Sequence, residues 1–171
     1  MHTHRLHIVC ARTNTLVGRC IRAMTSDDVN HCAIYLDCDI DCLYSFRRET
    51  RYNLLSGKFG TETLSDMARG STMYYMDTEI ILSAREFKRL KRMLKFFHRQ
   101  KYRYNYAALF LLKLNLGMTN QRNMVCSTVA AYIVSQVIDL DDPFYRYTPI
   151  KLSRELKTKF PTKTICIYYN D

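Results

Sequence analysis

The sequence predicts a single α+β domain that spans residues 1–171. Short apolar runs bounded by turn-forming residues predict strands, and segments with apolar residues at helical spacing predict helices. No internal repeat, low-complexity tract or linker divides the chain. Apolar residues make up 47% of the sequence and charged residues 25%, which is the composition of a folded domain rather than of a disordered segment.

The predicted strands are short runs of alternating or β-branched apolar residues. They cover residues 6–10, 31–37, 42–46, 73–82 and 164–169. A tight loop at 38–41 joins the second and third strands into a hairpin, and turn-forming residues at 25–28 precede it. Residues 47–61 are polar and contain Gly57 and Gly60, so they predict a loop.

The longest predicted helix begins at a capping box formed by Ser83 and Glu86. Its apolar face carries Phe87, Leu90, Leu94 and Phe97. Shorter helical segments are predicted at 15–24, 126–138 and 153–159. An apolar stretch, 107–116, ends at Gly117, and residues 139–149 predict a loop rich in Asp, Tyr and Pro.

The chain carries a formal net charge of +10, which favours an acidic partner such as nucleic acid, an anionic cell-wall polymer or an anionic membrane surface. Nine of the 26 basic residues fall between Arg85 and Arg103, on the polar side of the longest helix. This side is either a solvated helix face or a functional basic surface.

Several functional classes are disfavoured by what the sequence lacks. No apolar run reaches the roughly 18 residues that span a bilayer, and the first residues lack the apolar core of a secretory signal. We therefore expect a cytoplasmic protein. The seven cysteines include no Cys-x-x-Cys pair, and Cys38 and Cys42 fit a loop tip as well as a metal loop. We expect no metal and no cofactor.

A cysteine at the start of an apolar helix carries the most specific chemical signal. Cys126 is followed by Ser127 and a helical apolar run. Unpaired N–H groups and the helix dipole favour the thiolate at that position, and a thiolate is a nucleophile. His31 opens a predicted strand that can hold an imidazole as its base. The alternative is an inert buried cysteine and a structural histidine.

The order of these two residues, histidine strand first and cysteine helix later, resembles the circularly permuted branch of the NlpC-type papain-like superfamily. Five motifs carry the resemblance, which spans about residues 7–168. They are Ile21-Arg22 with Thr25 and His31 to Ile34, similar to "I-R-x-x-T … S-H-x-x-I"; Tyr44 to Arg48, similar to the next strand; Phe59 to Glu62, similar to "G-F-x-x-E"; Cys126-Ser127 with Val129, similar to "C-S-x-x-V"; and Thr148-Pro149 with Leu152, similar to a Pro-containing segment.

The resemblance implies a papain-like fold in which an antiparallel sheet packs against the cysteine helix. It also implies a cysteine hydrolase or acyltransferase that acts on an amide, ester or thioester bond of a peptide, cell-wall fragment or acyl lipid. Cys126 would attack the carbonyl carbon, and His31 would accept the thiol proton. The N–H of Cys126 and a neighbouring donor would stabilise the oxyanion.

Such a pair needs a third polar group to orient the imidazole. Many members of the superfamily place it on the strand after the histidine strand, where this chain has Ser45. We slightly favour Ser45, with the carboxylate of Glu62 as the alternative. Tyr104, which precedes the nucleophile, and Ser127, which follows it, are expected to bind substrate.

Two other functions stay open at this point. One is a binding or inhibitory protein that keeps the fold but has lost catalysis, which a weak third group such as Ser45 would suit. The other is a nucleic-acid-binding module that uses the basic helix and its interleaved aromatic residues.

Overall fold

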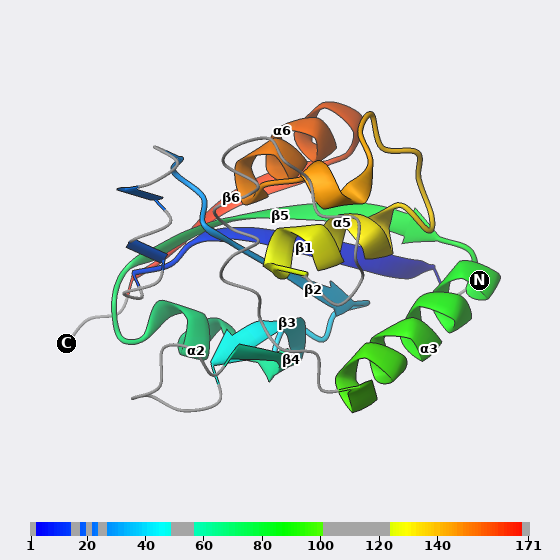
Figure 1. Ribbon diagram of the computed structural model, residues 1–171, viewed down its shortest axis with the longest axis horizontal. Helices are drawn as coiled ribbons and strands as arrows, with labels where there is room; N and C mark the ends of the chain where they lie inside the picture. The colour runs from blue at the N-terminus through cyan, green and yellow to red at the C-terminus, as the bar shows by residue number, and fades with distance from the viewer. Residues whose placement is uncertain are drawn as a thin grey trace.

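The computed structural model describes residues 3–14, 18–19, 22–23, 27–48, 57–100 and 124–168 (Figure 1). In these ranges the chain forms a six-stranded antiparallel sheet in the order β4-β3-β2-β1-β5-β6. The strands are β1 (His4–Arg12), β2 (His31–Leu36), β3 (Leu43–Arg48), β4 (Gly57–Glu62), β5 (Met73–Leu82) and β6 (Thr162–Ile167). The helices are α2 (Leu64–Ala68), α3 (Ala84–Gln100), α5 (Cys126–Val134), the 3₁₀ turn η1 (Phe144–Arg146) and α6 (Pro149–Lys159).

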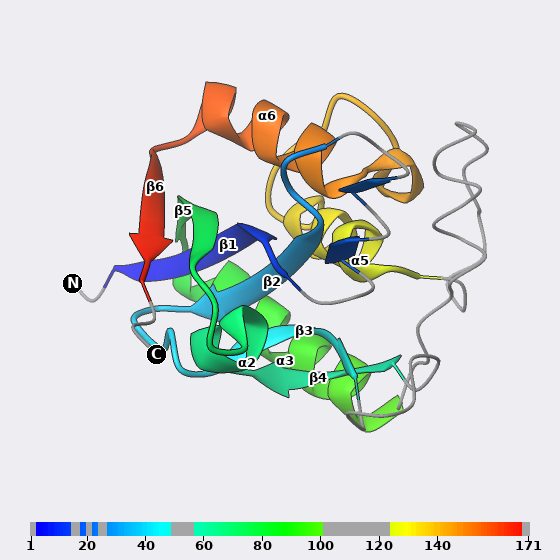
Figure 2. The same cartoon turned by 90° about the vertical axis from the view of Figure 1, so that its left-hand side faces the viewer.

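The sheet is tightly paired at its centre and opens on one side. β1 pairs with β5 from His4 to Arg12 and with β2 from Leu6 to Ala11. In contrast, the register between β2 and β3 has a single pair, Ile34 with Tyr44. Figure 2 shows β2 and β3 running apart beyond this pair. His31, at the start of β2, lies on the diverging side.

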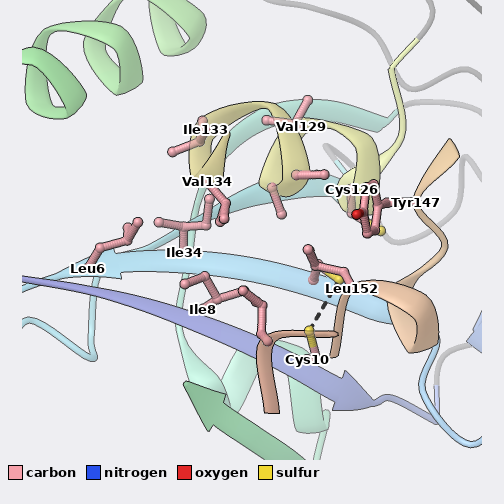
Figure 3. Packing of buried hydrophobic residues seen from close by; sticks show 14 of the residues in the cluster. Leu6, Ile8, Cys10, Ile34, Cys126, Val129, Ile133, Val134, Tyr147 and Leu152 are labelled. Carbon is pink, nitrogen blue, oxygen red and sulfur yellow. Dashed lines mark hydrogen bonds between the residues drawn. The ribbon is translucent and has the colours of Figure 1, made fainter. Parts of the chain in front are cut away.

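The main core lies between one face of the sheet and the helices α3, α5 and α6. Its buried members include Leu6 and Ile8 of β1, Ile133 of α5 and Leu152 of α6 (Figure 3). Leu94 of α3 belongs to the same cluster. α5 is buried along nearly its whole length, so apolar packing on the sheet fixes its position. A smaller core on the opposite face includes α2 and further residues of the central strands.

The prediction of a loop over 47–61 is wrong at both ends: 47–48 belong to β3, and 57–61 belong to β4, which pairs with β3. Gly57 and Gly60 weaken the strand signal. Phe59 overrides it, because its ring is buried and packs 5.8 Å from Phe46 and 5.7 Å from Phe97, measured between ring centroids. The short helix α2 was not predicted either.

Other predicted elements are confirmed with shifted ends. The capping box forms as expected, with the Ser83 N–H 2.7 Å from a Glu86 carboxylate oxygen. The cysteine helix ends at Val134 rather than 138, and the last helix begins at Pro149 rather than 153. Of the helix predicted at 15–24, residues 18–19 and 22–23 are described and helical, and the apolar stretch 107–116 lies outside the described residues.

The broader prediction, an α+β fold with an antiparallel sheet against the cysteine helix, is confirmed. Among the described helices, none has the length and apolar character needed to cross a bilayer.

Candidate active site

Cys126 is the first residue of α5 and is buried at the edge of the helix in the main core. The N-cap residue, Val125, has no polar side chain to cap the first N–H groups of the helix. The Oγ1 of Thr128 instead accepts a hydrogen bond from the Val125 N–H at 2.9 Å and fixes the entry of the chain. The first turn therefore keeps main-chain donors close to the thiol.

A buried polar network fixes His31 from the turn before β2. The side chain of Asn30 accepts the N–H of Thr13 at 2.9 Å and donates to the carbonyl oxygens of Thr13 at 2.9 Å and Gly18 at 3.0 Å. A Cβ on Gly18 would lie 2.7 Å from the Asn30 Nδ2 atom, so this approach requires glycine. The network places the chain just before His31 with little freedom.

Glu62, at the end of β4, contacts the imidazole directly. The Nε2 atom of His31 lies 2.7 Å from Oε1 of Glu62, and both side chains are largely buried. The hydroxyl of Ser45 donates to the same carboxylate oxygen. The preference for Ser45 as the group that orients His31 is therefore corrected, because the hydroxyl reaches the ring only through the carboxylate of Glu62.

The imidazole of His31 and the thiol of Cys126 interact, and each shifts the pKa of the other. Burial acts to lower the pKa of His31, but the charge of Glu62 and the hydrogen bonds to Cys126 and Glu62 outweigh it. The pKa of His31 is therefore raised well above its ordinary 6.5.

The thiol shows the complementary shift. Burial acts to raise the pKa of Cys126, but the hydrogen bond and charge of His31 outweigh this effect, and the pKa falls below its ordinary 9.0. Main-chain hydrogen bonding from Cys32 and Ser127 also acts to lower the pKa of the thiol. The opposite shifts of the two groups favour a thiolate beside an imidazolium.

The two expected substrate-binding residues have different outcomes. Tyr104 lies outside the described residues. Ser127 is fully buried, and its Oγ has no hydrogen-bond partner in the described part of the chain. The main-chain N–H of Ser127 acts to lower the pKa of Cys126. Substrate binding by the Ser127 side chain stays a prediction.

Sequence reasoning missed two contributions. The first is Cys32, whose main-chain N–H acts on the pKa of the thiol at a point where β2 has no register partner in β3. Asn30 was given no role. An asparagine directly before a histidine that opens a strand is the one local signal that could have marked it, since asparagine side chains commonly bond the backbone of turns.

The basic surface predicted on the longest helix is exposed. In α3, Arg85, Lys88, Arg89, Lys91, Arg92, Lys95 and Arg99 all face solvent, while Leu90, Leu94 and Phe97 are buried. Lys101 and Arg103 lie outside the described residues. Within the described ranges, no three His, Cys, Asp or Glu side chains are arranged to hold a metal ion.

No model of a known protein family matches the chain, and neither a curated protein nor a solved structure shows significant similarity to it.

Proposed function

We propose that this protein is a cysteine-dependent hydrolase or acyltransferase that acts on an amide, ester or thioester bond. Cys126 attacks the carbonyl carbon as a thiolate and forms an acyl-enzyme. His31 holds the thiol proton as an imidazolium and donates it to the leaving group. Water or a second acceptor then displaces the acyl group from the sulfur.

The observation that supports this proposal most strongly is the buried contact of Glu62 with His31, together with the opposite pKa shifts of His31 and Cys126. A buried carboxylate that bonds one side of an imidazole fixes the ring and stabilises its charged form. This arrangement favours an enzyme over a catalytically inactive binding protein, because the third group is a carboxylate and not only a hydroxyl.

The transition state would be stabilised at the start of α5. A tetrahedral intermediate places a negative oxygen beside the attacked carbon, and main-chain N–H groups are suitable donors. The N–H of Cys126 belongs to the uncapped first turn, where the helix dipole also favours negative charge. We assign the N–H of Cys126 to the oxyanion.

The papain-like, circularly permuted family is part of the same proposal. It is supported by the order of the histidine strand and the cysteine helix and by the antiparallel sheet on which both lie. The substrate classes we propose are a peptide, a cell-wall fragment or an acyl lipid. The exposed basic face of α3 would attract an acidic partner. The free thiols suit a reducing compartment such as the cytoplasm.

Trapping of the acyl-enzyme tests this function. The protein is mixed with a p-nitrophenyl ester, quenched in acid and digested, and acylated peptides are identified by mass spectrometry. We expect a stoichiometric adduct on Cys126 that disappears when water or an amine completes turnover. In Cys126→Ala the adduct and the burst of nitrophenol should both be lost.

Cys38→Ala is the matched control, because Cys38 is an exposed free thiol with no contact to His31 in the described structure. This variant should keep the burst unchanged. Acylation of Cys38 without acylation of Cys126 would count against the proposed nucleophile.

A further inference from the structure

Two further thiols lie in the same buried core as the candidate nucleophile Cys126. Cys10 of β1 and Cys32 of β2 are register partners across the two strands, and their sulfur atoms are 3.6 Å apart. Both residues are buried in the main core. Figure 3 shows the contact of Cys10 with the second sulfur as a dashed line, close to Leu152 and Cys126.

The backbone spacing of this pair already suits a disulfide. Residues directly opposite in antiparallel strands have Cα atoms about 4.5–5.5 Å apart, and disulfides form at Cα separations of about 4.4–6.8 Å. Only the sulfurs must approach, from 3.6 Å to a bond of about 2 Å. Closure therefore needs side-chain rotation and a small adjustment rather than a strand shift.

A small oxidant has a route to this pair. Cys10 lines a cavity of about 290 Å³ together with Val29, Tyr74 and Met76. The rim carries Arg12, which lies 3.6 Å from Asp28. The cavity is mostly apolar and is large enough for a peroxide, so burial in the core does not isolate the Cys10 thiol from solution.

The pair is also coupled to the nucleophile. Cys32 and Cys126 belong to the same buried cluster, where α5 packs on β2, and main-chain hydrogen bonding from Cys32 favours the Cys126 thiolate. The small adjustment that closes the disulfide would fall partly on Cys32 and change how its N–H group is oriented toward the Cys126 sulfur. The thiolate would then lose part of its stabilisation.

We propose that Cys10 and Cys32 form a reversible disulfide that lowers the reactivity of Cys126. With hydrogen peroxide as oxidant, two S–H bonds and the O–O bond break. One S–S bond and two O–H bonds form, and two water molecules are released. The two thiols lose two electrons and the peroxide gains them. A dithiol reductant reverses the step by exchange. The effect on activity rests on the proposed function, whereas the disulfide does not.

The disulfide is tested first in Cys126→Ala, where the nucleophile cannot take part. The protein is treated with hydrogen peroxide, its remaining thiols are blocked with N-ethylmaleimide, and digested peptides are analysed by mass spectrometry without reduction. We expect a linked peptide pair containing Cys10 and Cys32 that dithiothreitol separates. Cys38→Ala should give the same pair, and Cys10→Ala should not. Absence of the linked pair when Cys38 is fully oxidised would overturn the proposal.

The coupling is tested by activity on the p-nitrophenyl ester after the same treatment of otherwise wild-type protein. Loss of one hydrogen bond to a charged sulfur predicts a fall of about tenfold or more, restored by dithiothreitol. Cys10→Ala, or Cys10→Val to keep the core filled, should retain its activity. Equal loss in these variants would assign inactivation to Cys126 itself and overturn the coupling. Linked peptides in a protein with no activity before oxidation would instead contradict the proposed function.

Discussion

The Nε2 atom of His31 lies 2.7 Å from Oε1 of Glu62, and the same carboxylate oxygen accepts a hydrogen bond from Ser45. One carboxylate thus meets both the imidazole and a hydroxyl from the neighbouring strand. The ring is fixed by a charge that also stabilises its protonated form. The proposed catalytic role of His31 rests on this contact.

Replacement of Glu62 by glutamine should lower kcat by about a hundredfold, because the imidazolium loses its charged partner while the shape of the site is kept. The alkaline limit of activity should also move to lower pH. Steady-state kinetics across pH measures both effects. Glu79→Gln, a carboxylate of β5 that is partly exposed, is the control and should leave the profile in place.

Ser45→Ala should have a smaller effect in the same direction. The hydroxyl acts on His31 only through Glu62, so its loss removes about 1 kcal/mol of hydrogen bonding and lowers kcat severalfold. The comparison of kcat in Ser45→Ala and Glu62→Gln measures this order. A larger loss in Ser45→Ala would restore the hydroxyl as the main orienting group.

Activity should show a bell-shaped pH profile. The lowered pKa of Cys126 places the acid limit below 9.0, since protonation of the thiolate removes the nucleophile. The raised pKa of His31 places the alkaline limit well above 6.5, since loss of the imidazolium proton removes the acid for the leaving group. The two limits belong to the coupled pair. A profile that rises steadily to alkaline pH would indicate an ordinary thiol.

Asn30→Ala should destabilise the fold and the site together. The substitution removes the buried hydrogen bonds to Thr13 and Gly18 and leaves buried backbone groups without partners. A cost of about 1–3 kcal/mol in the free energy of unfolding follows. Urea titration measures it, with Asn14→Ala as an exposed control. Lower kcat in Asn30→Ala at temperatures where it stays folded would reflect the displaced His31.

Phe59→Ala should cost about 3–5 kcal/mol, because the ring joins β4 to β3 and α3 through Phe46 and Phe97. Thermal or urea unfolding measures this loss. Ile81→Ala, on the exposed face of β5, should change stability little. A small effect of Phe59→Ala would show that β4 contributes little to the core.

Local sequence patterns were sufficient for much of the fold. The apolar residues of β1, β2 and β5 alternate between two buried faces, and Ser83 with Glu86 marks the start of α3. These signals come from residues close together in sequence. The helix that begins at Cys126 is recognisable for the same reason, because its apolar run is continuous.

The third group of the site depended on long-range pairing instead. Glu62 meets His31 only because β4 pairs with β3 in a register that sets Gly60 opposite Ser45. Because Gly57 and Gly60 are typical of a loop, this strand was not predicted, and Glu62 could not be placed in the sheet. The effect of the Cys32 N–H on the Cys126 thiol could not be predicted for the same reason, because it depends on how β2 and β3 diverge.

The rate at which iodoacetamide alkylates Cys126, followed by mass spectrometry across pH, tests the central claim most directly. The exposed Cys38 serves as the internal reference in the same sample. We predict that Cys126 is alkylated with an apparent pKa below the ordinary 9.0 of a thiol, and that His31→Ala moves this value upward. A Cys126 that stays unlabelled at neutral pH while Cys38 reacts, or one that His31→Ala leaves unchanged, would contradict the thiolate–imidazolium pair.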